Sequence, residues 1–201
     1  MTVLGFDTSN YTTSMAAFDG VSGENQSSLL PVPPGELGLR QSDALFFHVK
    51  GLPELAGRLF SHVDGNDVRA VGVSTRPRAV EGSYMPCFLA GVCLAETVAA
   101  LRRVPLVQVS HQQGHLAAAA WSAGRLDLLD RPFLAWHLSG GTTELLHVAP
   151  QGWNLACTRI GGTTDISAGQ LIDRTGRLLG LPFPSGKELD RLSRDGGQPE
   201  G

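Results

Sequence analysis

The sequence is poor in the features that mark secreted and membrane-spanning proteins. It has three cysteines, Cys87, Cys93 and Cys157, which form no C-x-x-C pair and leave an odd count. Such usage is typical of free thiols in a reducing compartment. No apolar run approaches the about 18 residues of a membrane span. The opening residues, MTVLGFDTSN, also lack the basic flank and long apolar stretch of a secretion signal. We therefore expect a soluble, cytoplasmic protein without membrane contact.

Positive charge is scarce as well. The 201 residues contain 16 Lys and Arg against 19 Asp and Glu, which gives a formal net charge of −3. Because nucleic-acid-binding proteins usually carry a basic surface, this balance argues against DNA binding, and contact with RNA would need a local patch or a partner protein. Apolar residues, by contrast, are abundant: 42% of the chain is hydrophobic, enough for a sizeable core in one or two domains.

Short apolar runs alternate along the chain with longer segments of helical spacing. Strands are predicted for seven runs bounded by Gly, Ser or Pro: TVLGFDTS, SMAAFDG, RAVGVSTR, PLVQVS, PFLAWHLSG, TELLHVAP and NLACTRI. Helices are predicted at DALFFHVKGLPELAGRLFSHV, with a break near Gly51 to Pro53, and at MPCFLAGVCLAETVAALRR, HLAAAAWSAG and SAGQLIDRTGRLLG. The alternation predicts an α/β fold with a mixed sheet.

Two distant segments of the chain resemble each other. VLGFDTSNYTTSMAAFDG, from Val3, aligns without a gap on FLAWHLSGGTTELLHVAP, from Phe133, and both have the pattern strand, small polar turn, strand. One explanation is that two hairpins share turn chemistry. The other is a duplicated domain in which each copy opens with a hairpin whose backbone N–H groups form an anion nest. Duplication predicts two lobes, residues 1–132 and residues 133–201, of which the second is incomplete.

Two histidines, His111 and His115, stand four residues apart at the head of an alanine-rich run. On a helix both rings project from one face and can share one metal ion. Ser110 suits the N-cap position, which would place the pair in the first turn. A pair of exposed helix histidines without a ligand is the alternative, and a metal needs at least a third ligand. Gln112 stands where the H-E-x-x-H motif has its general base, so peptidase activity is not expected.

Four motifs in this order resemble the threonylcarbamoyl transferase family of tRNA modification (the TsaD family), formerly described as O-sialoglycoprotein endopeptidases. VLGFDTSNYTTSMAAFD is similar to the opening strand-turn-strand of that family, HQQGH to its H-x-x-x-H motif, and LSGGTTEL to its Ser-Gly-Gly turn. QLIDRTGRLLGLPFPSGKELDRL is similar to its segment ending in Pro-Gly-Gly. The resemblance implies the actin/hexokinase/Hsp70-like ATPase superfold with its duplicated domain.

The sequence also departs from the family pattern at three places. RPRAVEGSYMP replaces a Gly-Pro-Gly-Leu turn, NYTT replaces an opening turn with acidic residues or a cysteine, and Ser185-Gly186 replaces Gly-Gly. These departures favour a divergent paralogue. Complete family members are longer than this chain, so we also expect a truncated chain.

The resemblance implies a set of ligand-binding residues. His111 and His115 would hold one divalent metal ion, iron or zinc, per complete subunit, with a third ligand from an aspartate beyond Gly201. No further catalytic side chain is assigned. The residues implied to contact an adenine nucleotide or an acyl-adenylate are Asp7, Leu138, Ser139, Gly140, Gly141, Thr142, Asp173, Gly186 and Asp190.

The implied activity is transfer of a threonylcarbamoyl group from its adenylate to N6 of an adenosine next to a tRNA anticodon. tRNA would be the substrate, and other proteins of the threonylcarbamoyladenosine pathway would be partners. Two alternatives stay open. One is another carbamoyltransferase of the same superfold with a small-molecule or peptide acceptor, and the other is a non-catalytic nucleotide-binding paralogue that scaffolds a complex.

Overall fold

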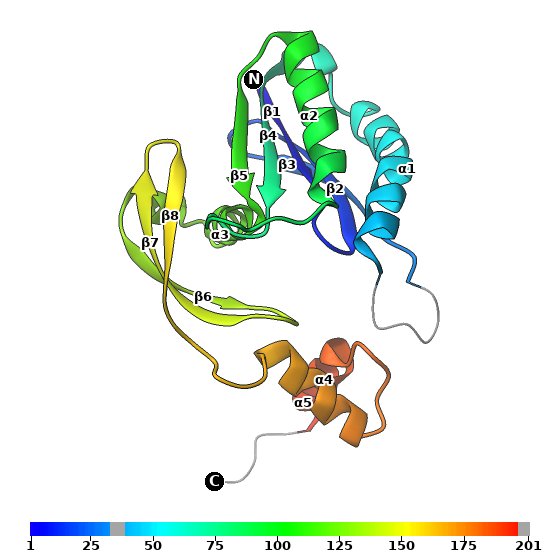
Figure 1. Ribbon diagram of the computed structural model, residues 1–201, viewed down its shortest axis with the longest axis vertical. Coiled ribbons are helices and arrows are strands. Elements are labelled where there is room, and N and C mark those ends of the chain that lie inside the picture. Colours follow the sequence, from blue (N-terminus) through cyan, green and yellow to red (C-terminus); the bar gives the residue numbers. More distant parts are fainter. Residues whose placement is uncertain (33–38, 197–201) are drawn as a thin grey trace. The chain divides into compact units, whose positions relative to one another are not determined.

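The computed structural model describes residues 1–32 and 39–196, which fold as two compact units, Met1–Arg125 and Leu126–Gly201 (Figure 1). In the described part of the chain, no helix is both long and apolar enough to cross a membrane. Each unit is built on an antiparallel meander of three strands. The boundary between lobes at residues 132 and 133 stays a prediction.

Unit one contains a five-stranded mixed sheet with the strand order β3-β2-β1-β4-β5. Strand β2 runs antiparallel to both β1 and β3, whereas β1, β4 and β5 run parallel to one another and so end at the same edge of the sheet. This mixed α/β arrangement confirms the predicted class. The strands are β1 (Thr2–Asp7), β2 (Thr12–Phe18), β3 (Gly23–Leu29), β4 (Val68–Arg76) and β5 (Leu106–Ser110).

The core of unit one lies between this sheet and two helices, α1 (Gln41–Phe60) and α2 (Phe88–Arg102). Alternate residues of β1 point to opposite faces, and Leu4 and Phe6 are buried on the helix-covered face. Figure 1 shows α1 and α2 side by side over that face. A third helix, α3 (His111–Ser122), begins directly after β5, and a short 3-10 helix, η1 (Gly65–Asp67), precedes β4.

The predicted break in the first helix was wrong. Helix α1 runs without interruption from Gln41 to Phe60 and contains Pro53. Proline removes the backbone N–H that would bond the carbonyl of Val49. Both residues are exposed, so water can bond that carbonyl instead. Burial of the leucines on the opposite side, Leu52, Leu55 and Leu59, holds the helix together across the proline.

Unit two consists of a three-stranded antiparallel sheet followed by a pair of helices. The strands are β6 (Phe133–Leu138), β7 (Thr143–Gln151) and β8 (Asn154–Gly162), in the order β6-β7-β8. A 3-10 helix, η2 (Leu126–Asp130), precedes them. The helices α4 (Ala168–Leu178) and α5 (Gly186–Asp195) pack on each other.

The two hairpins of the internal repeat have the same strand register. Val3 pairs with Phe18 in the first hairpin and Phe133 pairs with Val148 in the second, so both partners are shifted by 130 residues (133 − 3 and 148 − 18). The next pairs, Leu4 with Ala17 and Leu134 with His147, keep this shift. The predicted pair of equivalent strand-turn-strand hairpins is therefore present in the structure.

Candidate functional site

The ends of β1 and β5 bring Asp7 and His111 together although 104 residues separate them. The Oδ2 atom of Asp7 lies 2.8 Å from Nδ1 of His111. On the other side of that ring, Nε2 of His111 lies 2.8 Å from Nε2 of His115, one turn further along α3. The two Nε2 atoms thus face each other, and the carboxylate fixes the orientation of the first ring.

A capping box stabilises the first turn of helix α3. The backbone N–H of Gln113 donates to the Ser110 hydroxyl at 3.2 Å, and the backbone N–H of Ser110 donates to the Gln113 side-chain oxygen at 2.6 Å. Both side chains are buried. The N-cap predicted at Ser110 is confirmed, and it sets the direction in which the first-turn histidines project.

Asp7 is an anion held in a partly buried position. Burial acts to raise its pKa, but hydrogen bonding and charge from His111, together with hydrogen bonds from Ser74 and Ser9, outweigh burial and lower the pKa to about 2. The backbone N–H of Ser9 donates to Oδ1 of Asp7 at 2.9 Å, and the Ser9 hydroxyl donates to the same oxygen. The carboxylate is therefore bonded on both oxygens and faces the imidazole as a charged partner.

The histidine pair fits two positions of a metal shell. Within residues 1–32 and 39–196, no group of three His, Cys, Asp or Glu side chains is arranged to hold a metal ion. The two imidazoles are nevertheless donors of the kind that zinc or iron takes, and their Nε2 atoms lie 2.8 Å apart, at hydrogen-bond distance. A carboxylate on Nδ1 of His111 is the arrangement that orients metal-bound histidines. The metal itself stays a prediction.

A pocket of about 720 Å³ opens beside the histidines and includes Asp7, His111 and His115 in its wall. The floor of the pocket is the face of the sheet that α1 and α2 do not cover. Gly5 lies on this face, because its neighbours in β1, Leu4 and Phe6, point to the helix-covered face. Much of that floor carries small side chains or none, at Gly5, Ser14, Ala16, Gly72 and Ser74. The pocket therefore has room for a substrate group next to the imidazoles.

In unit two, the N-terminus of α4 packs directly on the Ser-Gly-Gly turn between β6 and β7. The hydroxyl of Ser167 donates to the carbonyl of Gly140 at 2.6 Å, and the backbone N–H of Ala168 donates to the Thr143 hydroxyl at 2.7 Å. A Cβ added at Gly169 would lie 2.5 Å from the Cα of Gly140, so this approach requires glycine. The positive end of the α4 dipole thus meets the turn.

Comparison with known proteins decides the family. The TsaD family model, described as tRNA N6-adenosine threonylcarbamoyltransferase, matches residues 42–200. The chain belongs to this transferase family. A tRNA N6-adenosine threonylcarbamoyltransferase of Lacticaseibacillus casei is 39% identical over 131 residues, which are 65% of this chain and 35% of the relative. One of Geobacter sulfurreducens is 35% identical over 155 residues, 74% of this chain and 41% of the relative. The chain thus spans less than half the length of these relatives.

Solved structures support the superfold. YeaZ from Pseudomonas aeruginosa matches with a TM-score of 0.50 at 15% sequence identity and covers 84% of this chain and 68% of that chain. This likeness concerns the fold alone, and it agrees with the actin-like ATPase superfold that the motifs implied.

The transferase motif after β8 lies in the α4–α5 pair. Oδ1 of Asp173 accepts a hydrogen bond from the backbone N–H of Ser185 at 2.9 Å and so ties α4 to the start of α5. Asp190 is exposed and pairs with Arg194 at 2.8 Å, and Gly186 is the exposed first residue of α5. Asp173 therefore has a structural task, and contact of these three residues with a nucleotide stays a prediction.

The turn residues implied by the transferase motif are brought together between β6 and β7. The backbone N–H of Ser139 donates to the carbonyl of Thr142 at 2.8 Å, and that of Gly141 donates to the Ser139 hydroxyl at 3.3 Å. Leu138, just before the turn, is exposed. The anion nest predicted for Ser139, Gly140, Gly141 and Thr142 remains a prediction.

Sequence reasoning missed two partners of Asp7. Ser9 stands two residues after an aspartate that ends a strand, a spacing at which Asp commonly bonds the backbone, so a local signal existed. Ser74 lies on β4 and reaches Asp7 only because β1 and β4 are neighbours in the sheet. No pattern in the sequence around Ser74 predicts that contact.

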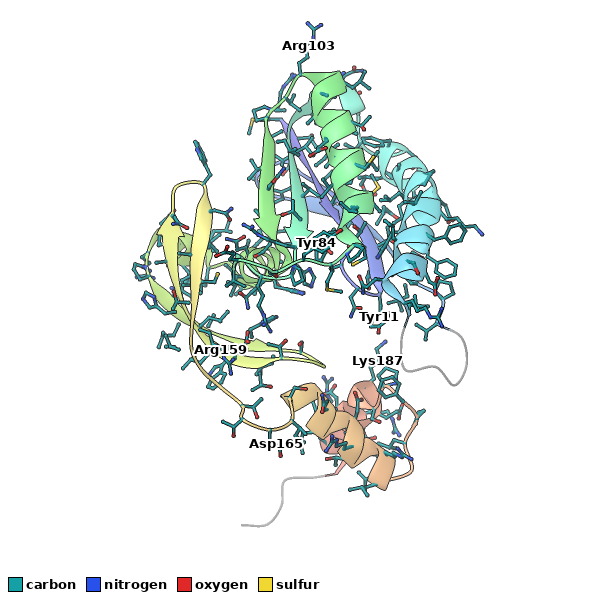
Figure 2. All side chains as sticks on the ribbon, viewed as in Figure 1. Tyr11, Tyr84, Arg103, Arg159, Asp165 and Lys187 are labelled. Atoms are coloured by element: carbon teal, nitrogen blue, oxygen red, sulfur yellow. The ribbon has the colours of Figure 1, made fainter. Side chains whose placement is uncertain are left out.

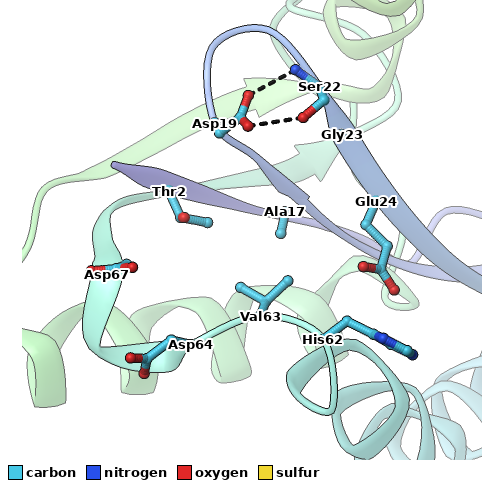
Figure 3. Close-up of a pocket in the computed structure, with 10 residues that line it drawn as sticks. All are labelled: Thr2, Ala17, Asp19, Ser22, Gly23, Glu24, His62, Val63, Asp64 and Asp67. Atoms are coloured by element: carbon cyan, nitrogen blue, oxygen red, sulfur yellow. Dashed lines mark hydrogen bonds between the residues drawn. The ribbon is translucent and has the colours of Figure 1, made fainter.

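A second pocket, of about 480 Å³, lies at the end of the sheet where β1 begins (Figure 3). Asp19 and Asp64 belong to its acidic wall, and both stabilise turns. Asp19 accepts from the backbone N–H groups of Ser22 and Val21, and these bonds lower its pKa to about 2. Asp64 accepts from the backbone N–H of Asn66 at the start of η1. These carboxylates have structural partners, so the candidate site stays with the histidine pocket.

Proposed function

We propose that this member of the transferase family transfers a threonylcarbamoyl group from its adenylate to N6 of an adenosine next to a tRNA anticodon. The observation that carries the proposal is the Asp7–His111–His115 constellation in the wall of the 720 Å³ pocket. Family membership and the names of the relatives support the class of reaction.

The chemistry is an acyl transfer in which the adenosine amine attacks the carbonyl carbon. The new C–N bond forms as the bond to the adenylate phosphate breaks, AMP leaves, and the amine loses one proton. His111 and His115 would hold a divalent metal ion, which when bound supplies Lewis-acid polarisation. Asp7 would accept a hydrogen bond from the Nδ1–H of His111 and so leave the Nε2 lone pair for the metal ion.

Unit two would bind the nucleotide part of the substrate. Backbone N–H groups of the turn from Ser139 to Thr142 would hold the acyl-adenylate, and Asp190, exposed on α5, would accept hydrogen bonds from ribose hydroxyls. tRNA as acceptor, other pathway proteins as partners and the cytoplasm as the place of action belong to the same proposal.

A transfer assay with metal analysis tests this function. We would incubate the natural full-length protein with threonylcarbamoyl-adenylate and a tRNA transcript, and measure threonylcarbamoyladenosine by mass spectrometry of the nucleosides. His111→Ala and His115→Ala should each lose most metal and most product while remaining folded, because neither ring is buried in the core. The matched control is His62→Ala, an exposed histidine of the other pocket. Equal metal content and equal product in all four proteins would refute the proposal.

A further inference from the structure

The segment between β4 and α2 passes beside the histidine pair and is fixed there at both ends. At its start, the carbonyl of Pro77 accepts a hydrogen bond from the backbone N–H of Gln112 at 3.1 Å. At its end, the carbonyl of Cys87 accepts from the Thr8 hydroxyl at 2.9 Å. The next ring, Phe88, meets His111 edge-on with centroids 6.5 Å apart. The segment is thus attached to the elements that carry Asp7 and His111.

The middle of this segment is closed on itself. The backbone N–H of Arg78 donates to the Ser83 hydroxyl at 3.0 Å, and the backbone N–H of Ser83 donates to the carbonyl of Val80 at 3.3 Å. Gly82 has a φ of +73°, a left-handed conformation that glycine adopts without strain. Side chains displayed on such a closed turn lose little further backbone freedom when they bind a ligand.

The exposed side chains there include two guanidinium groups, a phenol and the carboxylate of Glu81. Arg76 and Arg78 are exposed, and Arg76 is in register with Ser110, the residue before His111. Tyr84 is 63% exposed, and Figure 2 shows it at the edge of the sheet where β4 and β5 end. Guanidinium groups bind phosphate bidentately, and an exposed aromatic ring offers a face on which a base can stack.

We propose that residues 76–84, here named the acceptor loop, recognise single-stranded RNA around the target adenosine. Arg76 and Arg78 bind backbone phosphates, and Tyr84 stacks on a neighbouring base. With a net charge of −3 the chain offers no general attraction for RNA, so recognition needs such a local patch beside the reacting groups. An acidic peptide would also suit two arginines, but it would leave the exposed ring without a stacking partner. The inference rests on the proposed function, because it takes tRNA as the acceptor.

Salt-dependent RNA binding tests the acceptor loop. The natural full-length protein would be titrated with an unmodified tRNA transcript by fluorescence anisotropy at several salt concentrations. Arg76→Gln combined with Arg78→Gln should weaken binding at least about tenfold and reduce the slope of log K against log salt by about 1.4, the value for two lost single-strand phosphate contacts. Tyr84→Ala should weaken binding at least about fivefold and leave that slope unchanged.

The matched control removes two charges elsewhere on unit one. Arg69 is the second residue of β4, the strand that Arg76 ends, and Arg103 follows α2 at the far end of the unit (Figure 2). Arg69→Gln combined with Arg103→Gln should keep wild-type affinity and slope. Equal RNA binding by the wild type, the loop variants and the control would overturn the loop assignment and leave the transferase proposal intact. A wild type that binds no tRNA yet retains metal would overturn both proposals.

Discussion

At the scale of single residues, Asp7 links the chemistry of the site to the fold. It ends a core strand, bonds the turn that follows through Ser9, and fixes His111 at a distance of 2.8 Å. A carboxylate in this position raises the basicity of the imidazole and selects its tautomer. Asp7 is thus a positioning residue for the metal that the histidines would hold.

Replacement of this carboxylate by its amide should show that role. Asp7→Asn should lower metal affinity about ten- to a hundredfold, the usual effect of removing a partner of a metal-bound histidine. Competition with a chromogenic chelator would measure it. Asp19→Asn is the control, because Asp19 also has a pKa of about 2 but serves a turn at the other end of the sheet. Equal affinity in the wild type and both variants would reduce Asp7 to a fold-supporting residue.

Local sequence signals predicted part of this site. The spacing of His111 and His115 and the N-cap at Ser110 are properties of one helix turn, and the structure has both. The bond between Asp7 and His111 could not be inferred in the same way, because only the pairing of β1, β4 and β5 brings those strand ends together. Contacts that depend on sheet order have no signature in a short stretch of sequence.

At the scale of elements, the runs with apolar periodicity were predicted and the polar ones were not. Strand β3, GENQSSL, escaped prediction because it is a polar edge strand without an apolar alternation. The break expected in α1 was wrong because three buried leucines outweigh one exposed proline. In both places, tertiary packing determines the secondary structure, and local propensity alone does not predict it.

One buried pair joins α1 to β2. Nδ1 of His48 lies 2.8 Å from the Thr13 hydroxyl, and both side chains are fully or almost fully buried. Burial lowers the pKa of His48, and a backbone hydrogen bond at Asn10 and the charge of Asp7 offset this only in part. The folded state therefore disfavours the charged form of this imidazole.

The lowered pKa of His48 should make stability depend on pH. Because its folded pKa lies below 6.5, the unfolded chain takes up a proton first as the pH falls. Stability supplied by His48 is thus complete above 6.5 and declines below that value. Between about pH 7.5 and about pH 5.5, the free energy of unfolding in urea should fall more for the wild type than for His48→Gln. Equal losses would show that His48 titrates alike in both states.

At the scale of the whole molecule, the repeat identifies the strand of unit two that lacks a neighbour present in unit one. Strand β6 is the counterpart of β1, as the shared register shows. Strand β1 pairs with β2 on one side and with β4 on the other, whereas β6 has only β7 as a neighbour among the described residues. The outward side chains of β6 are apolar and exposed: Leu134 by 61%, Trp136 by 63% and Leu138 by 57%.

An apolar edge strand is a template for pairing with another chain. We therefore expect the 201-residue chain to self-associate with rising concentration, which size-exclusion chromatography with light scattering would measure. Trp136→Lys should reduce the association, because a lysine on an edge strand opposes strand pairing. Trp153→Lys is the control: Trp153 is 98% exposed but lies in the turn between β7 and β8, away from that edge. If both variants reduce association equally, general surface apolarity rather than the edge of β6 drives it, and if neither does, β6 is not the interface.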